Sequence, residues 1–365
     1  MLAVAGDPGG ANALTPVLHQ LHCEQKVTLL TKPYREAIDS WQHLPCASAP
    51  IRNRQSATQT STDIFTHDVA LVLTGTSVNG LDYEKAYIGS ARQAGIPSLA
   101  VLDYWSNYAK RFANHGTEQL TYLPDRIAVM DEIARQGMLA EGIPDHIINI
   151  TGQPALDGLD KIHQAFSPRK KAAVRRHLGV GEDETLILFA SQPIAECCGH
   201  TASDAGYIGY TEKTVVQDLV ASLDSMASTE GKMTLVVRPH PREKSDLFTP
   251  KTTEKGVRLL IDRHTDKQNL MLSVDIVTGM DSMLLVEACY LHCPTLSLQP
   301  GLLSGDALPS NRAGLCTTVY ENTHIQPALK KLLATNSHTP LSVRPQDATQ
   351  NIISHLYELL KSTSA

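Results

Sequence analysis

A histidine between two prolines is the first feature of this 365-residue sequence that could take part in chemistry. Residues 234–237 form a short apolar run rich in β-branched side chains, which predicts a buried parallel strand. Pro239 and Pro241 end this strand, because proline has no N–H to donate to a neighbouring strand. His240 has little backbone freedom, since a proline restricts the residue before it. The pattern predicts a rigid turn that presents an imidazole at the carboxyl end of a strand.

Two arginines, Arg238 and Arg242, flank this histidine. Ligands of open α/β sheets bind at the carboxyl ends of the strands, and guanidinium groups there suit an anion such as phosphate. The alternative is a corner stiffened by proline that carries a solvated histidine. This segment alone leaves both interpretations open.

A second strand, turn and helix with similar chemistry follow later in the chain. Residues 275–279 predict another buried strand, and either Asp281 or Ser282 could cap the helix after it. That helix, residues 283–291, is apolar nearly all round, which indicates burial. A helix N-terminus with free N–H groups, preceded by Gly279 and a serine hydroxyl, makes a phosphate site.

One charged residue, Glu287, lies more than one turn into this apolar helix. An unpaired carboxylate would be costly there, so Glu287 needs a backbone donor, a basic side chain or a ligand hydroxyl as its partner. Pro294 ends the helix, and residues 295–298 predict the next strand.

The order of these elements resembles the nucleotide-binding half of GT-B glycosyltransferases. The likeness rests on a strand, Arg-Pro-His-Pro, a strand, Gly-Met-Asp-Ser, a helix with Glu287, and then Cys-Pro-Thr-Leu-Ser-Leu. It is strongest to subgroups with a His-Pro motif and a downstream serine motif: bacterial sialyltransferases, capsular Kdo transferases, and glycerol- or ribitol-phosphate polymerases. The sequence is also similar to hydrolysing UDP-N-acetylglucosamine 2-epimerases, which share the fold. Ser282 is not followed by the paired glycines of the epimerase pattern.

The resemblance implies an α/β, GT-B-like fold with two Rossmann-like domains facing a central cleft. It implies that His240 and Ser282, with its helix N-terminus, bind the donor phosphate, and that Glu287 binds the ribose. The loop after a predicted strand at residues 185–190 resembles the Gln-Pro element of some capsule transferases, so Gln192 could contact a base or a phosphate, or be a turn residue. The expected donor-nucleotide residues are Gln192, Arg238, His240, Gly279, Asp281, Ser282 and Glu287.

The N-terminus predicts the start of a Rossmann-like domain, with a strand at residues 2–5, a glycine-rich loop at 6–12 and then a helix. The glycines do not fit G-x-G-x-x-G, so the loop does not predict dinucleotide binding. It resembles the first glycine-rich loop of GT-B N-terminal domains, which faces the interdomain cleft. Asp7 would lie there, although a turn or cap role is equally open. Acceptor contacts are expected from Gly9, Gly10 and Asn12.

An aromatic cluster follows the predicted strand at residues 97–102, in a chain with 5% aromatic residues. Aromatic faces with a nearby carboxylate suit sugar rings, so Tyr104 and Trp105 are expected to bind the acceptor beside Asp103. The alternative is that both rings pack under a loop. Residues 50–62, which are rich in Ser, Thr, Gln and Arg, predict a loop at the cleft.

Residues 151–157 look like the interdomain crossover of GT-B proteins and 2-epimerases, which places a hinge near Gln153. We therefore expect an acceptor domain at 1–152, joined by a C-terminal helix at 345–365, and a nucleotide-donor domain at 153–344. A basic helix that starts at Ser167 predicts a solvated face, or a surface for an anionic acceptor or a membrane.

The composition argues against several classes of protein. The net charge of −6 and a pI near 6.2 argue against a general nucleic-acid binder, and 42% hydrophobic residues suffice for packed cores. No apolar run reaches membrane-spanning length and no signal peptide is recognisable, so a cytoplasmic protein is expected. The seven cysteines show no framework spacing, and the adjacent pair at residues 197–198 is poorly suited to one tetrahedral metal ion.

The motifs and their resemblance imply a glycosyltransferase, or a transferase of polyol-phosphate groups, that uses a nucleotide-activated donor in surface polysaccharide or glycoconjugate synthesis. The resemblance favours a donor linked to CMP or CDP. Charge on the leaving phosphate would be met by fixed donors including His240, and the acceptor hydroxyl would lose its proton to Asp7 or Asp103. No D-x-D motif appears where a metal-dependent sugar transferase would carry it, so neither metal nor cofactor is expected. The expected partners are a nucleotide-sugar donor and a hydroxyl acceptor. A nucleotide-sugar 2-epimerase or hydrolase is the first alternative, and a non-catalytic binding protein the second.

Overall fold

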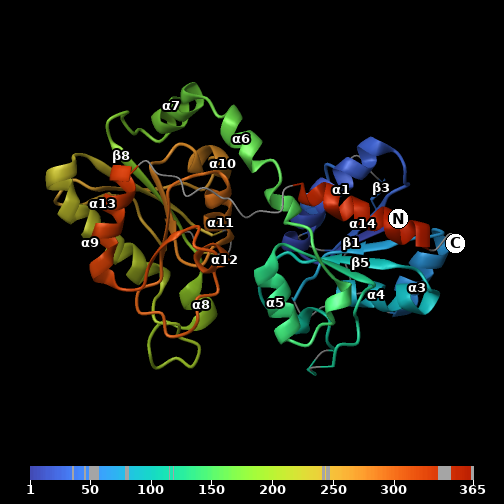
Figure 1. The fold of residues 1–365 in the computed structure, drawn as a ribbon. Coiled ribbons are helices and arrows are strands. Elements are labelled where there is room, and N and C mark those ends of the chain that lie inside the picture. Colours follow the sequence, from blue (N-terminus) through green and yellow to red (C-terminus); the bar gives the residue numbers. More distant parts are fainter. Residues whose placement is uncertain are drawn as a thin grey trace. The chain divides into compact units, whose positions relative to one another are not determined.

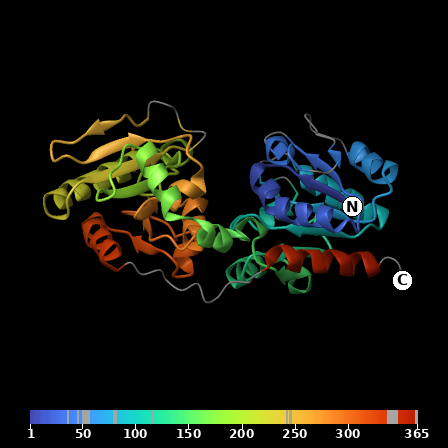
Figure 2. The same cartoon turned by 90° about the horizontal axis from the view of Figure 1, so that it is seen from above.

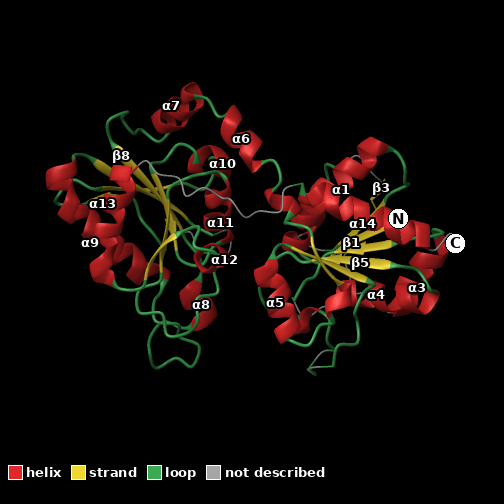
Figure 3. Ribbon diagram, viewed as in Figure 1, coloured by secondary structure: helices red, strands yellow, loops and turns green. Residues whose placement is uncertain are grey.

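The computed structural model describes residues 1–34, 37–44, 47–48, 57–78, 82–114, 116–117, 119–240, 243, 247–335 and 347–362. The chain divides into two compact units. Unit 1 contains Met1–Asp157 and Val343–Ala365, and unit 2 contains Gly158–Ser342. Each unit has its own sheet with helices against it (Figure 1, Figure 3). No helix among the described residues is both long and apolar enough to span a membrane.

The sheet of unit 1 has the described strand order β3-β2-β1-β4-β5-β6-β7, and every pair is parallel. The strands are β1 (Leu2–Ala5), β2 (Leu30–Pro33), β3 (Ala47–Ser48), β4 (Val72–Thr74), β5 (Ser98–Val101), β6 (Arg126–Val129) and β7 (Ile148–Ile150). The direction of strand addition reverses between β1 and β4. Their carboxyl ends form a topological switch point, which is where parallel α/β sheets bind ligands.

The helices of unit 1 follow the strands in a Rossmann-like order. They are α1 (Pro8–Glu24), α2 (Ala37–Trp41), α3 (Ala57–Thr66), α4 (Tyr83–Ala94) and α5 (Glu132–Ala140), with the short 3₁₀ helices η1 (Ala109–Arg111), η2 (Asp145–Ile147) and η3 (Pro154–Leu156). Helix α3 corrects the loop expected at residues 50–62, of which 50–56 lie outside the described residues. Thr60 and Ile64 are fully buried, and the Thr60 hydroxyl contacts that of Ser90 at 2.7 Å. Tertiary packing therefore stabilises a helix that its polar composition does not indicate.

The C-terminal helix α14 (Ala348–Ser362) packs against α1 in unit 1, and Figure 2 shows it in red beside the rest of that unit. Ile352, Ile353 and Leu356 are fully buried in the same apolar cluster as Leu14 of α1. The backbone N–H groups at the start of α14 donate to Asp157, which anchors the helix N-terminus to the end of unit 1.

Unit 2 repeats this architecture with the described order β10-β11-β9-β8-β12-β13-β14, parallel except for the β10–β11 edge pair. Its strands are β8 (Thr185–Ala190), β9 (Met233–Arg238), β10 (Lys251–Thr252), β11 (Arg258–Ile261), β12 (Ile276–Gly279), β13 (Thr295–Leu298) and β14 (Thr317–Val319). Strands β8 and β12 are adjacent, so the loops after them lie at the switch point of this sheet.

The helices of unit 2 connect these strands. They are α6 (Leu159–Ala165), α7 (Pro168–His177), α8 (Ile194–Cys198), α9 (Glu212–Glu230), α10 (Lys267–Met271), α11 (Met283–Tyr290), α12 (Pro309–Arg312), η4 (Asn322–His324) and α13 (Ile325–Thr335). The core of this unit is a separate cluster of buried side chains around Phe189, Leu235 and Ile276. The two units therefore have independent hydrophobic cores.

Replacement of Leu356 by alanine should destabilise unit 1 selectively, because Leu356 is fully buried in the core of that unit. Loss of a buried leucine side chain typically lowers the free energy of unfolding by about 2–5 kcal/mol. Hydrogen exchange measured by mass spectrometry should become faster in α1 and β1 peptides and stay unchanged in unit 2. Ser354→Ala, at an exposed position of the same helix, is the control. Equal acceleration in both units would contradict the assignment of α14 to unit 1.

Candidate functional site

A double hydrogen bond joins the two loops at the switch point of unit 2. The Gln192 Nε2 donates to the Asp281 carbonyl at 2.8 Å, and the Asp281 N–H donates to Gln192 Oε1 at 2.9 Å. Gln192 was expected to contact the nucleotide, but both ends of its side-chain amide are used on this backbone. It fixes the turn after β12 to the loop after β8.

This turn leads directly into helix α11. Ser282 is the N-cap, and its Oγ accepts the Leu284 N–H at 3.2 Å. Gly279 ends β12 where a Cβ would lie 3.1 Å from the Ala190 carbonyl oxygen, so a small residue suits this close approach. The first N–H groups of α11 and a half-buried serine hydroxyl thus lie at the carboxyl edge of the sheet, which is an arrangement that binds anions.

The partner that Glu287 requires is a lysine. Lys267 of α10 contacts both carboxylate oxygens, at 2.8 Å and 2.6 Å, and the Glu287 side chain is 17% exposed. Any contact with a ribose would therefore be made by a carboxylate that already has a cationic neighbour.

Strand β9 ends beside the same loops. The guanidinium of Arg238 donates to Asp262 at 2.7 Å and to the Thr265 carbonyl at 2.6 Å, so its charge is paired within unit 2. The half-buried His240 donates its backbone N–H to Glu243. Arg238 is better placed to hold the turn than to neutralise a ligand, which leaves His240 as the expected phosphate contact from this strand.

Glu243 is a residue that the sequence did not indicate. It accepts the hydroxyl of Ser191 at 2.6 Å as well as the His240 N–H, and burial raises the pKa of its carboxyl. Glu243 thereby connects the β9 turn to the β8 loop. Pro241 and Arg242, which belong to the motif predicted here, lie outside the described residues.

The first glycine loop of unit 1 presents Asp7. Asp7 caps α1, and its Oδ1 accepts the Gly10 N–H at 2.8 Å. Burial, followed by the nearby Asp103 carboxylate, raises the pKa of Asp7 to about 6. A Cβ on Gly75 would lie 2.9 Å from the Cα of Gly10, so the loop after β4 touches the first turn of α1, which begins at Pro8 within the loop predicted at residues 6–12. A carboxyl with this pKa can exchange a proton near neutral pH.

A buried glutamate, Glu84, supports this loop and was not found from the sequence. Its carboxylate accepts the Gly6 N–H at 2.8 Å and, from Ser77, the N–H at 3.2 Å and the hydroxyl at 2.6 Å. Burial raises the pKa of Glu84. A Cβ on Gly6 would collide with this carboxylate, so Gly6 and Glu84 are sterically matched.

Asp103 lies in the same group, but its charge is paired. It forms an ion pair with the buried Arg111 and accepts a hydrogen bond from Thr76 at 3.3 Å. Gly9 is close by, because a Cβ there would collide with the Asp103 carboxylate. Of the two carboxylates predicted as the base, Asp7 is therefore the better candidate, and Asp103 acts on it through its charge.

The two aromatic residues predicted to bind the acceptor differ in their environments. Trp105 is 4% exposed, and its indole N–H donates to Asp131 at 2.8 Å, so its ring packs under the loop and has no face for a sugar. Tyr104 is half-buried beside it, with 6.1 Å between the ring centroids. Asn12 is exposed on the first helical turns of α1. Gly9, Gly10 and Asn12 lie in the first turns of α1, the helix that Asp7 caps, and Tyr104 stays the predicted aromatic contact.

Comparisons with known proteins bear on the fold. Neither the family models nor the curated proteins gave a match. Among solved structures, the UDP-GlcNAc 2-epimerase of Methanocaldococcus jannaschii is similar over 98% of this chain and 99% of that chain, with 14% identity and a TM-score of 0.68. The UDP-GlcNAc-bound 2-epimerase of Neisseria meningitidis covers 98% and 100%, with 15% identity and a TM-score of 0.66. A glycosyltransferase of Rickettsia africae covers 99% and 96%, with 11% identity and a TM-score of 0.63.

The chain has a GT-B-like α/β fold. This likeness extends over nearly the full length of the compared chains and confirms the fold class predicted from the sequence. Identities of 11–15% support the fold alone. The narrower resemblance to transferases with a His-Pro motif stays a prediction.

Asp7→Asn tests the raised pKa of Asp7 through the pH dependence of stability. Because the pKa is about 6 in the folded protein and 3.8 ordinarily, the folded state binds the proton more tightly than the unfolded state. The contribution of Asp7 to the free energy of unfolding therefore falls as the pH rises from about 4 to about 6, and stays low above that. Asparagine is also a good N-cap, so the variant should be more stable than wild type at about pH 7.5 and gain little at about pH 4. Urea denaturation at both pH values measures this difference.

The matched control is Asp266→Asn, which removes the charge of another N-cap aspartate. Asp266 caps α10, accepts the Asn269 N–H at 2.9 Å and is exposed. A stability difference for Asp7→Asn that is the same at both pH values would contradict the raised pKa.

Proposed function

We propose that this protein is an enzyme that acts on nucleotide-activated sugars, with glycosyl transfer as its reaction. Unit 2 would bind the donor nucleotide and unit 1 would bind the acceptor. The observation that carries the proposal is the Gln192–Asp281 hydrogen-bond pair, which holds the N-terminus of α11 and the Ser282 hydroxyl at the switch point of unit 2.

The donor role of unit 2 follows from charge and geometry. A diphosphate or monophosphate would meet the helix N-terminus and the Ser282 hydroxyl, with His240 from the next loop. Glu287, held by Lys267, is proposed to bind the ribose hydroxyls. Structures of similar fold support this class of ligand: the 2-epimerase of Methanocaldococcus jannaschii is in complex with UDP-GlcNAc and UDP, and the MnaA protein of S. aureus is bound to UDP.

The donor base is proposed to be a pyrimidine. The motifs of this chain resemble those of transferases that use CMP-sugars or CDP-polyols, whereas the structures of similar fold are described with uridine nucleotides. Both bases therefore belong in the test, and a purine nucleotide is the negative control.

The acid–base role of unit 1 is assigned to Asp7. In the proposed transfer, Asp7 takes the proton of the acceptor hydroxyl while that oxygen bonds to the anomeric carbon of the donor sugar. The bond from the anomeric carbon to the phosphate oxygen breaks, and the nucleotide leaves with the electron pair. The negative charge that develops on its phosphate is stabilised by the α11 N-terminus, Ser282 and His240.

The alternative is a nucleotide-sugar 2-epimerase or hydrolase. The fold favours it as much as it favours a transferase, since several of the similar structures are UDP-GlcNAc 2-epimerases. Asp7 could serve either reaction, because a carboxyl with a pKa of about 6 can donate or accept a proton.

Thermal denaturation with CMP, CDP, UDP and GDP tests the donor site. A ligand that binds only the folded protein raises the free energy of unfolding by RT ln(1 + [L]/Kd), or about 2.7 kcal/mol at a hundredfold excess over Kd. We expect a cytidine or uridine nucleotide to raise the melting temperature and GDP to leave it unchanged. His240→Ala should reduce this shift and leave the melting temperature without ligand unchanged.

The control for this variant is His324→Ala, at an exposed histidine of η4 in the same unit. Loss of the unliganded fold in His240→Ala would show that His240 is structural. No shift with any of the four nucleotides would contradict the proposed donor site.

Product analysis distinguishes the candidate reactions. A transferase should release nucleotide from its donor at a rate that depends on a saccharide acceptor, whereas an epimerase or hydrolase should form product without one. Asp7→Asn should lower the rate at least about a hundredfold in either case, because a general base contributes that much. Tight nucleotide-sugar binding with no turnover, unchanged in Asp7→Asn, would support a binding protein instead.

A further inference from the structure

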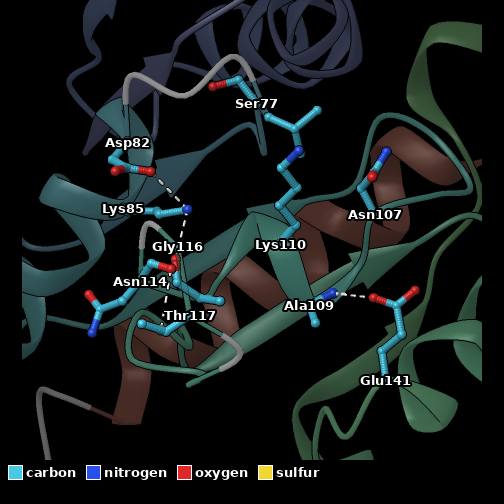
Figure 4. Close-up of a pocket in the computed structure, with 12 residues that line it drawn as sticks. Ser77, Asp82, Lys85, Asn107, Ala109, Lys110, Asn114, Gly116, Thr117 and Glu141 are labelled. Carbon is cyan, nitrogen blue, oxygen red and sulfur yellow. Dashed lines mark hydrogen bonds and ion pairs between the residues drawn. The ribbon is translucent and has the colours of Figure 1, made fainter. Parts of the chain in front are cut away.

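Unit 1 contains a pocket of about 620 Å³ that the proposed reaction does not yet use. It lies between the loop after β4 and the segment around η1, at the carboxyl side of the sheet (Figure 4). Its volume falls within the range of small-molecule sites. The lining combines apolar surface from Val78 and Ala113 with hydroxyl, amide and ammonium groups.

The fixed charges of this pocket are largely paired within its own wall. The ammonium of Lys85 contacts Asp82 and the Ala113 carbonyl, both at 2.8 Å, and Glu141 accepts the Ala109 N–H at 2.6 Å. Lys110 differs: among the described residues, no carboxylate lies within ion-pair distance of it. Figure 4 shows its side chain extending across the pocket toward Ser77. An ammonium that extends over a polar cavity suits an anionic group of a ligand.

Neutral polar groups surround this ammonium. Asn107 lines the pocket in a left-handed backbone conformation (φ 56°), which asparagine tolerates better than most residues. Asn114 and Thr117 line it as well, joined by the Thr117 hydroxyl to Asn114 carbonyl contact at 3.4 Å. Amides and hydroxyls of this kind can pair with sugar hydroxyls, while Val78 offers an apolar surface to the C–H face of a ring.

Two routes of contacts connect the pocket lining to the residues around Asp7. Ser77 lines the pocket and donates to Glu84, which also binds the Gly6 N–H beside Asp7. Lys110 lines the pocket, and the next residue, Arg111, pairs with Asp103. The pocket lining therefore shares contacts with the residues that hold Asp7 and Asp103.

We propose that this pocket binds the acidic group of a saccharide acceptor, with Lys110 contacting a sugar carboxylate or a sugar phosphate. The role as an acceptor site rests on the function proposed above, whereas the binding itself depends only on unit 1. Lys110 is a binding residue in this assignment, and the proton transfer stays with Asp7.

Calorimetric titration of the full chain with D-glucuronate, D-glucose 6-phosphate, D-glucose and inorganic phosphate tests this assignment. We expect at least one of the two acidic sugars to bind about tenfold more tightly than glucose and than phosphate alone. Binding of only one acid would identify its charged group as the one recognised. Lys110→Ala should weaken that binding about tenfold, and Lys110→Arg should retain most of it.

Lys26→Ala is the matched control, because Lys26 is an exposed lysine elsewhere in unit 1. The same affinity for glucose as for both acidic sugars, or unchanged affinity in Lys110→Ala, would overturn the proposal, as would the absence of binding by either acid. Nucleotide binding by unit 2 is measured in the same samples. If no nucleotide binds but an acidic sugar still binds in a way that depends on Lys110, the proposed function is contradicted and the pocket assignment stands.

Discussion

The carboxyl edge of unit 1 depends on one buried carboxylate, that of Glu84. Burying a charge is costly unless hydrogen bonds compensate for the lost water, and Glu84 receives them from the loops that follow β1 and β4. These are the two loops of the switch point. Because one side chain satisfies N–H groups of both, neither loop can move without leaving a buried charge or a buried donor unpaired. Asp7 directly follows Gly6, so the hydrogen bond from Gly6 to Glu84 also restricts the position of Asp7.

In unit 2, the loops at the carboxyl edge of the sheet are held by different side chains. The side-chain amide of Gln192 forms two hydrogen bonds with the backbone of Asp281, one to its carbonyl and one from its N–H. Glu243 accepts hydrogen bonds from the His240 N–H in the β9 turn and from the Ser191 hydroxyl in the β8 loop. The three loops at this edge are thus connected by the neutral amide of Gln192 and by Glu243, whose carboxyl has a pKa that burial raises. The N-terminus of α11 adds positive potential at this edge, which favours an anionic ligand there.

Buried β-branched strands, glycine turns and capped helices are local signals that could be recognised in the sequence, and the resemblance of their order to GT-B proteins predicted the fold class. The capping positions of Asp7 and Ser282 after strands could be recognised as well, and both residues are N-caps in the structure. Glu84 and Glu243 were missed because their roles come from contacts with loops distant along the chain or from burial, which no local pattern reveals. Trp105 was given a sugar-binding role for the same reason: its hydrogen bond to Asp131 joins residues on different loops. Pairwise contacts across a sheet edge are set by tertiary structure.

The three carboxylates of unit 1 differ in how their charge is compensated, and this difference separates their roles. Glu84 has three donors and is inaccessible, so it serves structure. Asp103 forms an ion pair with the buried Arg111, and its carboxylate repels that of Asp7. Asp7 receives the Gly10 N–H but also the repulsion of Asp103, and burial further disfavours its charged form. A group destabilised in this way is poorly suited to a purely structural task, and it is the one whose protonation can change during a reaction at neutral pH.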